Sequence, residues 1–141
     1  MGKRDSQDDP HSPHWADLAW SLWHHLDTTA QRGLVPRKRG IYRLRCKGRS
    51  ALIYIGISDK LSSRLGGLRR ARNHPPRYRG HSAAACVVQH EARGAIVEVS
   101  RTQLENVSRR ELMGLEVDLI AACRARFGDS PACQFHGGPL E

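Results

Sequence analysis

The sequence predicts a small α+β domain with a mostly antiparallel sheet flanked by helices, preceded by an N-terminal helical arm. Residues 40–46 and 51–57 form two strand-like runs around a short polar turn. Residues 60–72 and 108–127 repeat apolar side chains at helical spacing. A chain of 141 residues, 39% of them hydrophobic, is long enough to build one core of ordinary size.

The N-terminal segment differs from the rest of the chain in composition. Residues 1–36 are predicted to form a disordered tail and a helical arm, and residues 37–141 the main domain. Two interpretations of the arm stay open: it docks on its own core, or it contacts a second copy of the chain or another partner. A helix over residues 14–27 is expected because these side chains fall on one stripe: Trp15, Leu18, Ala19, Leu22, Trp23 and Leu26.

The first helix of the main domain is expected directly after the hairpin. Asp59 is predicted to cap a helix over residues 60–72, and Pro75 ends it. Its core stripe consists of Leu61, Leu65 and Leu68.

Two further strands and a last helix complete the predicted order. The strands are expected over residues 83–90 and 95–101, around a turn that contains glycine. The last helix, residues 108–127, is expected to begin at the N-cap Ser108 and to end at Gly128.

The apolar runs and the cysteines predict a cytoplasmic protein. No apolar run reaches the roughly 18 residues of a membrane span, and the N-terminus lacks the apolar region of a signal peptide. Cys46, Cys86, Cys123 and Cys133 form no C-x-x-C pair and are expected to be reduced. Cys46 and Cys123 fall on apolar faces and are predicted to lie in the core.

Positive charge gathers in one stretch of the chain. The net charge is +9, and residues 37–80 hold 14 of the 23 Lys and Arg residues but only one of the 14 acidic residues. This density predicts a polyanionic partner, and nucleic acid is the partner that fits it best. The alternative is a solvated basic face without a ligand. The predicted DNA-binding residues are Arg43, Arg45, Lys60, Arg69, Arg70, Arg72, Arg77 and Arg79.

One carboxylate falls inside an apolar helix stripe. In residues 108–127, Glu116 lies among the apolar positions, whereas Glu111 and Asp118 lie on the solvated side. A carboxylate in such a stripe is costly unless it is paired or binds a cation. Two interpretations remain: an ion pair with an arginine, or a ligand for a hard divalent ion.

The hairpin places two tyrosines on one face. With the turn near Gly48, Tyr42 is expected opposite Gly56, and Tyr54 is its diagonal neighbour. Gly56 is expected to leave open space beside both hydroxyls. Arg64 on the following helix can reach back toward this hairpin. The plainer interpretation is that both tyrosines serve only packing.

These features together resemble the GIY-YIG nuclease family over residues 40–135. The resemblance implies a divalent-metal-dependent nuclease that hydrolyses a phosphodiester bond and leaves 5′-phosphate and 3′-hydroxyl ends. The motifs that match are Gly40-Ile41-Tyr42, Tyr54-Ile55-Gly56, Arg64 and a helical glutamate, Glu116.

The resemblance also implies a role for each site residue. Glu116 would be the single protein ligand of Mg²⁺ or Mn²⁺, and no small-molecule cofactor is expected. Tyr42 would help to deprotonate the attacking water, and Tyr54 would support it. Arg64 would stabilise charge on the phosphate.

Two positions depart from the family pattern. Many members have His or Tyr one turn after the arginine, where this chain has Leu68. His81 or His74 could supply an imidazole from the basic loop instead. Members also tend to have an asparagine after a proline near the C-terminus, where this chain has Gln134. Gly56, His81 and Gln134 are therefore predicted to be supporting residues.

The sequence thus favours a small DNA endonuclease of restriction or defence type. The alternative is a nucleic-acid-binding module that has lost catalysis and keeps only the basic surface of residues 37–80. The presence of all four motif residues favours the nuclease.

Overall fold

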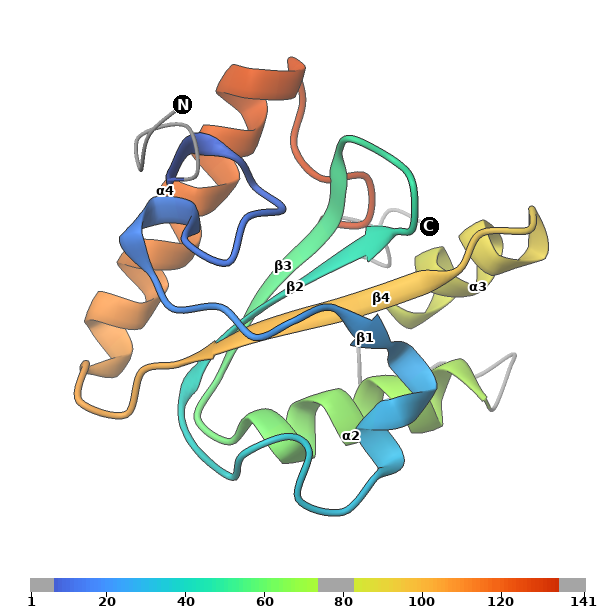
Figure 1. The fold of residues 1–141 in the computed structure, drawn as a ribbon, viewed down its shortest axis with the longest axis horizontal. Coiled ribbons are helices and arrows are strands. Elements are labelled where there is room, and N and C mark those ends of the chain that lie inside the picture. The colour runs from blue at the N-terminus through green and yellow to red at the C-terminus, as the bar shows by residue number, and fades with distance from the viewer. Residues whose placement is uncertain (1–6, 74–82, 135–141) are drawn as a thin grey trace.

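A computed structural model of the chain describes residues 7–73 and 83–134. In these residues a four-stranded antiparallel sheet, in the order β1-β4-β2-β3, has helices on both faces (Figure 1). The predicted α+β class is therefore confirmed. Within the described part of the chain, no helix combines the length and apolarity that a membrane crossing requires.

The predicted hairpin forms the centre of the sheet. Strands β2 (Gly40–Cys46) and β3 (Leu52–Ser58) pair around a turn in which Gly48 has a φ of +85°, a conformation that suits glycine. Strand β4 (Val97–Gln103) pairs with the other side of β2. Strand β3 is consequently an edge strand.

Helices cover the two faces of the sheet differently. Helices α2 (Leu61–Arg72) and α3 (Ala84–Ala92) lie on one face, and α4 (Arg109–Phe127) lies on the other (Figure 1). The core beneath α2 includes Tyr42, Leu44, Tyr54, Leu61, Leu65 and Leu68. The core beneath α4 includes Ile41, Leu52, Ile55, Leu112, Leu119 and Cys123.

The ends of α4 follow the sequence prediction. The Ser108 hydroxyl accepts from the Glu111 amide, and the Glu111 carboxylate accepts from the Ser108 amide, so a capping box begins the helix. Gly128 ends it with a φ of +84°.

The predicted cap of α2 is wrong. Lys60 occupies the N-cap position and makes no side-chain capping bond. The Asp59 carboxylate instead accepts from Arg39 and Arg109, at 2.9 and 3.0 Å. Two guanidinium partners compete successfully with the helix terminus for this carboxylate.

The strand predicted over residues 83–90 is a helix, α3. The run Ala83 to Val87 is apolar without a clear period, so it fits a short buried strand or a buried helix equally well. Alanine is the best helix former, and the helix buries Ala84, Cys86 and Val87 on one side. The strand predicted over 95–101 exists as β4, starting at Val97.

The helix predicted over residues 14–27 is also wrong. The segment forms a short 3₁₀ turn, η1 (Trp15–Asp17), then an extended stretch, a two-residue strand, β1 (His24–His25), and a second 3₁₀ helix, η2 (Leu26–Ala30). Ala16 has a φ of +57°, which interrupts a helix at its first turn.

The sheet edge explains why this segment is extended. Strand β1 pairs with β4, and the Ser21 amide donates to the Arg101 carbonyl at 2.7 Å. Trp15 and Trp20 are buried in the core beneath α4. These tryptophans therefore dock on the chain's own core, and the contacts give no support to the alternative of a dimer or partner helix.

Two cysteines differ from the sequence expectation. Cys86 and Cys133 form a disulfide, so the prediction that all four are reduced is wrong. The pairing joins positions 47 residues apart, which no local spacing reveals. Cys46 and Cys123 are free and buried, as predicted.

Candidate active site

The hairpin register places both motif tyrosines on the same face. Tyr42 lies opposite Gly56, as the turn position predicts, and Tyr54 lies opposite Leu44. The two phenol rings are 5.9 Å apart between centroids. Both rings are buried on the face that α2 covers.

Gly56 does not leave open space, contrary to the sequence expectation. A Cβ at this position would lie 2.4 Å from Cζ and 2.5 Å from the hydroxyl oxygen of Tyr42. The ring of Tyr42 therefore occupies the volume above the glycine. Glycine is required here because the ring packs directly against the backbone of β3.

Arg64 joins the two tyrosines from the first turn of α2. Its guanidinium donates to the phenol oxygens of Tyr42 and Tyr54, and the Tyr42 hydroxyl donates to the Tyr54 oxygen. The three side chains, here called the tyrosine–arginine cluster, form one hydrogen-bonded network. Arg64 is half-buried, so part of the network is open to solvent.

The protonation state of Tyr42 follows from its burial. Burial raises the pKa of Tyr42 well above 10, the nearby Tyr54 raises it further, and Arg64 opposes both. Tyr42 is therefore a neutral phenol at neutral pH. It can accept a hydrogen bond through its oxygen and donate one at the same time.

Glu116 lies on α4, the helix of the opposite face. It is half-buried, and burial raises the pKa of its carboxyl, while the positive charge of Arg109 lowers it. Within the described residues Glu116 forms no ion pair, since the Arg109 guanidinium bonds to Asp59. The predicted alternative of an ion pair with an arginine is therefore not what the described residues form.

The structure thus brings three of the four predicted catalytic residues together. Tyr42, Tyr54 and Arg64 are in direct contact, whereas Glu116 interacts electrostatically with Arg109 instead. Helices α2 and α4 both contact the edge strand β3.

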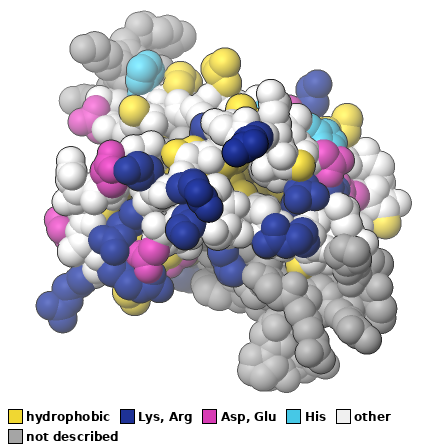
Figure 2. Space-filling model, turned by 90° about the horizontal axis from the view of Figure 1, so that it is seen from below, with side chains coloured by type: hydrophobic (Ala, Val, Ile, Leu, Met, Phe, Trp, Pro, Cys, Tyr) yellow, Lys and Arg dark blue, Asp and Glu magenta, His cyan; other side chains and the backbone are white. Residues whose placement is uncertain are grey.

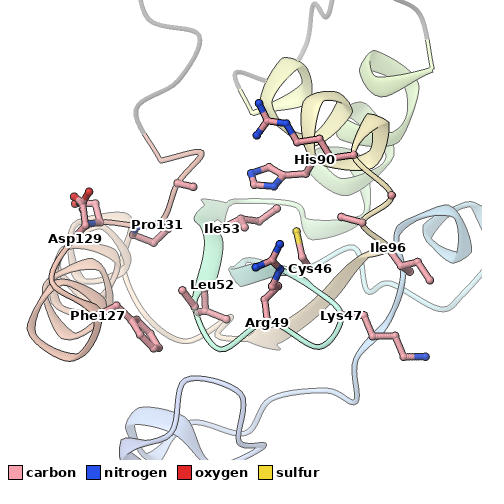
Figure 3. Close-up of a pocket in the computed structure, with 16 residues that line it drawn as sticks. Cys46, Lys47, Arg49, Leu52, Ile53, His90, Ile96, Phe127, Asp129 and Pro131 are labelled. Carbon is pink, nitrogen blue, oxygen red and sulfur yellow. Dashed lines mark hydrogen bonds between the residues drawn. The ribbon is translucent and has the colours of Figure 1, made fainter.

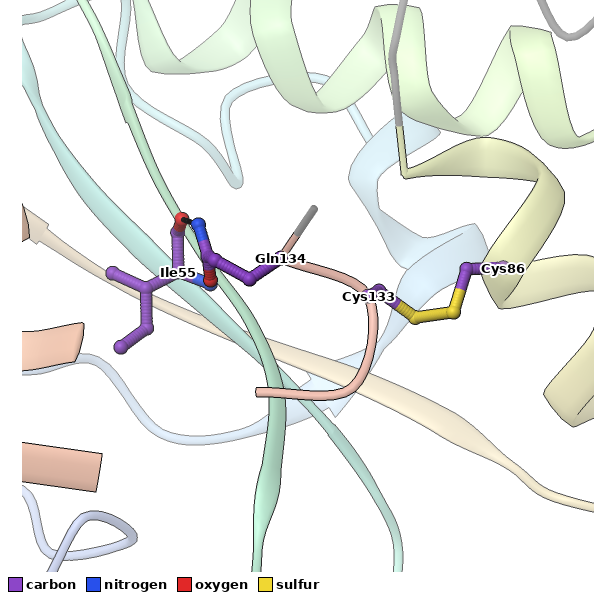
Figure 4. Close-up of a disulfide and its surroundings, with 4 residues drawn as sticks. All are labelled: Ile55, Cys86, Cys133 and Gln134. Atoms are coloured by element: carbon purple, nitrogen blue, oxygen red, sulfur yellow. Dashed lines mark hydrogen bonds between the residues drawn. A yellow bond between two sulfur atoms is a disulfide. The ribbon is translucent and has the colours of Figure 1, made fainter. Parts of the chain in front are cut away.

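Gln134 lies beside the same edge strand. Its side-chain nitrogen donates to the Ile55 carbonyl at 2.7 Å, and its side-chain oxygen accepts from the Ile55 amide at 2.9 Å (Figure 4). The Cys133 amide also donates to the Ile53 carbonyl at 2.7 Å. Cys133 and Gln134 together therefore hold the backbone on both sides of Tyr54, and the supporting role of Gln134 in catalysis stays a prediction.

Three of the predicted DNA-binding arginines are bonded inside the fold. Arg43 is fully buried with its guanidinium 4.3 and 4.5 Å from the ring centres of Trp20 and Trp23, and it donates to the Pro10 carbonyl. Burial lowers the pKa of Arg43 to about 9, with Arg45 adding to the effect. A side chain enclosed in this way cannot contact DNA, so this prediction is wrong.

Arg45 and Arg72 likewise form ion pairs with acidic side chains. Arg45 donates to Glu98 at 2.9 Å, and the exposed fractions of the two side chains are only 21% and 14%. Arg72 donates to Glu91 at 2.7 Å and also bonds to Asp27. The count of basic residues therefore overstates the charge that a ligand would meet.

The remaining predicted positions divide into two groups. Lys60 and Arg70 are exposed, and Arg69 is partly exposed. Arg77, Arg79 and the histidines His74 and His81 lie outside the described residues. The face of the molecule below the sheet of Figure 1 shows many Lys and Arg side chains with a few acidic ones among them (Figure 2).

A pocket lies elsewhere, at the turn of the hairpin. It measures about 680 Å³ and extends from the C-terminal end of α4 to α3, whose His90 points into it (Figure 3). None of the four predicted catalytic residues lines it. No sequence motif points to His90, although its position four residues after Cys86 on a helix puts both on one face.

Comparison with solved structures finds the N-terminal GIY-YIG endonuclease domain of UvrC from Thermotoga maritima. The magnesium-bound domain is 25% identical over 72% of this chain and 88% of that chain, with a TM-score of 0.42. Two point mutants bound to the catalytic divalent cation are similar as well. One is 24% identical over 72% and 87% of the chains, with a TM-score of 0.43. The other is 26% identical over 71% and 86%, with a TM-score of 0.42.

No protein-family model and no curated protein matches the sequence. The three solved structures described above are all GIY-YIG N-terminal endonuclease domains of UvrC.

Proposed function

We propose that this chain is a divalent-metal-dependent endonuclease that hydrolyses phosphodiester bonds in DNA and leaves 5′-phosphate and 3′-hydroxyl ends. The tyrosine–arginine cluster supports this proposal most strongly. A network of three polar side chains on a hydrophobic face costs desolvation energy, which simple packing does not require. The cluster also forms where both tripeptide motifs and the helical arginine meet.

Arg64 is suited to bind the phosphate. A phosphodiester resists attack because it is an anion, and a planar guanidinium neutralises two of its oxygens at once. The two phenol oxygens hold Arg64 in place before a substrate arrives. In this proposal Arg64 stabilises the charge that grows on the phosphate during attack.

Tyr42 is suited to position a water molecule. Its phenol is neutral at neutral pH, so in the free protein its oxygen accepts a hydrogen bond rather than a proton. Arg64 lowers the pKa of Tyr42, and further positive charge at the site would lower it more. Tyr54 fixes the direction of the Tyr42 hydroxyl.

Glu116 fits the requirements of a Mg²⁺ or Mn²⁺ ligand. Mg²⁺ keeps several of its waters and is bound by one or two carboxylates, which a single half-buried glutamate provides. Burial raises the pKa of this carboxyl, so a bound cation relieves an existing cost. When bound, the ion supplies a Lewis acid that withdraws charge from the phosphate oxygens.

Cleavage of supercoiled plasmid tests the proposal. The intact protein with Mg²⁺ or Mn²⁺ is expected to nick or linearise the plasmid, and EDTA is expected to stop it. Tyr42→Phe and Arg64→Ala are expected to lower the rate by about 100-fold or more. DNA ligase should reseal the nicks, because it requires 5′-phosphate and 3′-hydroxyl ends.

A matched pair of variants on one helix provides the control. Glu116→Ala is expected to abolish cleavage, whereas Asp118→Ala, an exposed position two residues further on, should keep it. Equal cleavage by both variants would contradict the role of Glu116. Retardation of DNA by the intact protein without any cleavage would favour the alternative, a nucleic-acid-binding module.

A restriction or defence-type role is the narrower form of the proposal. It predicts discrete fragments from a plasmid rather than a smear, and a different pattern on methylated and unmethylated copies of that plasmid. Uniform degradation of both copies would contradict it.

A further inference from the structure

A cluster of potential metal ligands lies outside the proposed active site. The sulfur atoms of Cys86 and Cys133 and a ring nitrogen of His90 all lie within 4.8 Å of one another. Helix α3 presents Cys86 and His90 one turn apart, and Cys133 approaches from the segment after α4 (Figure 4). Three donors from two distant segments therefore meet at one point.

The donor set has the chemistry of a zinc site. Two thiolates and one imidazole are typical ligands of Zn²⁺, with a water molecule or a fourth side chain completing the tetrahedron. Ligand atoms about 2.0–2.3 Å from Zn²⁺ lie roughly 3.3–3.8 Å apart, a spacing that small side-chain rotations here can reach.

The cluster is accessible from solvent through the pocket at the hairpin turn. His90 lines this pocket of about 680 Å³ and is partly exposed, whereas both cysteines are buried (Figure 3). Hydrated cations can therefore reach the imidazole without unfolding of the sheet. Both cysteines are buried, so an unpaired thiolate there is costly, and a bound cation would offset that cost.

The two cysteines are joined as a disulfide in the structure, so the metal site requires reduction. An external dithiol reductant supplies two electrons and two protons to the Cys86–Cys133 bond. The S–S bond breaks, the two cysteines become thiols, and the reductant is itself oxidised to a disulfide. Binding of Zn²⁺ then displaces the two thiol protons to solvent. Either cross-link ties α3 to the segment that carries Gln134.

We propose that Cys86, His90 and Cys133, in their reduced form, bind Zn²⁺. The ion anchors the C-terminal segment on the edge of β3 when the disulfide is open. Cys133 bonds to Ile53 and Gln134 to Ile55, so this anchor acts on the backbone on both sides of Tyr54. The inference does not depend on nuclease activity.

Cobalt binding to the reduced, full-length chain tests the site. The protein is reduced without oxygen, the reductant is removed, and Co²⁺ is added as a spectroscopic probe for Zn²⁺. We expect about one Co²⁺ per chain, with intense visible bands of tetrahedral geometry and thiolate charge-transfer absorption. Zn²⁺ should displace the Co²⁺ and remove these bands.

Variants identify the ligands. Cys86→Ser, Cys133→Ser and His90→Ala are each expected to weaken binding by about 100-fold or more. Cys123→Ala, a buried free cysteine on α4 in the other core, is the matched control and should bind normally. Circular dichroism identifies any variant that fails to fold, and for either cysteine the thiolate charge-transfer spectrum of the intact chain is then decisive.

Three results would overturn the proposal: retention of the disulfide by the folded chain after reduction, absence of Co²⁺ binding by the reduced chain, or loss of binding in Cys123→Ala with retention in Cys86→Ser.

Discussion

The ring of Tyr42 lies directly on Gly56, its partner across the hairpin. A methyl group at residue 56 would lie only 2.4 Å from Cζ of Tyr42. Glycine at this position is therefore a condition for the position of the Tyr42 hydroxyl, and through it for the contacts of Tyr54 and Arg64.

We expect Gly56→Ala to displace Tyr42 and to cost about 1–3 kcal/mol of stability through overpacking. Cleavage should fall by about 100-fold, because a displacement of about 1 Å has effects of this size on catalysis. Thermal denaturation and the plasmid assay measure the two effects.

Gly114→Ala on α4 is the control for this change. A Cβ at Gly114 meets no atom within 4 Å, and alanine is the better helix former. The variant should gain about 0.5–1 kcal/mol and keep its cleavage rate. Equal losses in both variants would show that Gly56 has no special relationship with Tyr42.

We expect Glu116→Gln to stabilise the metal-free protein at pH 7. Burial raises the pKa of Glu116, so the carboxyl favours folding only at acid pH and loses that contribution as the pH rises through its folded-state pKa. The melting temperature should rise by about 1–3 °C at pH 7 and stay unchanged near pH 4.

Added Mg²⁺ should reverse the order of these two proteins. A ligand that binds only the folded state stabilises it, so Mg²⁺ is expected to raise the melting temperature of the intact chain and not of Glu116→Gln. An equal rise in both would place the metal at another residue.

Arg43→Ala should destabilise the fold by about 3 kcal/mol. The change removes a cation held against Trp20 and Trp23 and leaves a cavity between β2 and the N-terminal segment. Tryptophan fluorescence during denaturation reports the loss. Arg70→Ala, an exposed position on α2, should stay within about 0.5 kcal/mol of the intact chain.

Gln134→Ala should expose the backbone of β3. The two hydrogen bonds to Ile55 are lost, which costs about 1–2 kcal/mol. Hydrogen exchange of the Ile55 amide is expected to accelerate. Gln103→Ala, an exposed glutamine on β4, should leave that exchange rate unchanged, and acceleration in both variants would indicate a general loss of stability.

The sequence was a good guide to the hairpin because local chemistry determines it. The turn around Gly48 locates the hairpin, and beyond an irregularity between Leu44 and Arg45 the register places Tyr42 opposite Gly56 with Tyr54 on the same face. Helix α4 was predictable for the same reason, since Ser108 and Gly128 mark its ends.

The errors concern contacts between distant segments. Residues 14–27 have helical periodicity, yet hydrogen bonds to the edge of β4 prevail over it. The enclosure of Arg43 by tryptophans from that segment, and the pairing of Cys86 with Cys133, depend on the same long-range packing. Neither leaves a local pattern in the chain.

Two segments lie at opposite edges of the sheet: residues 21–25 beside β4, and Cys133 and Gln134 beside β3. Exposed strand margins are templates for aggregation. A chain shortened to residues 37–130 would therefore expose the edge strands β4 and β3 and is expected to self-associate, although every predicted catalytic residue would still be present.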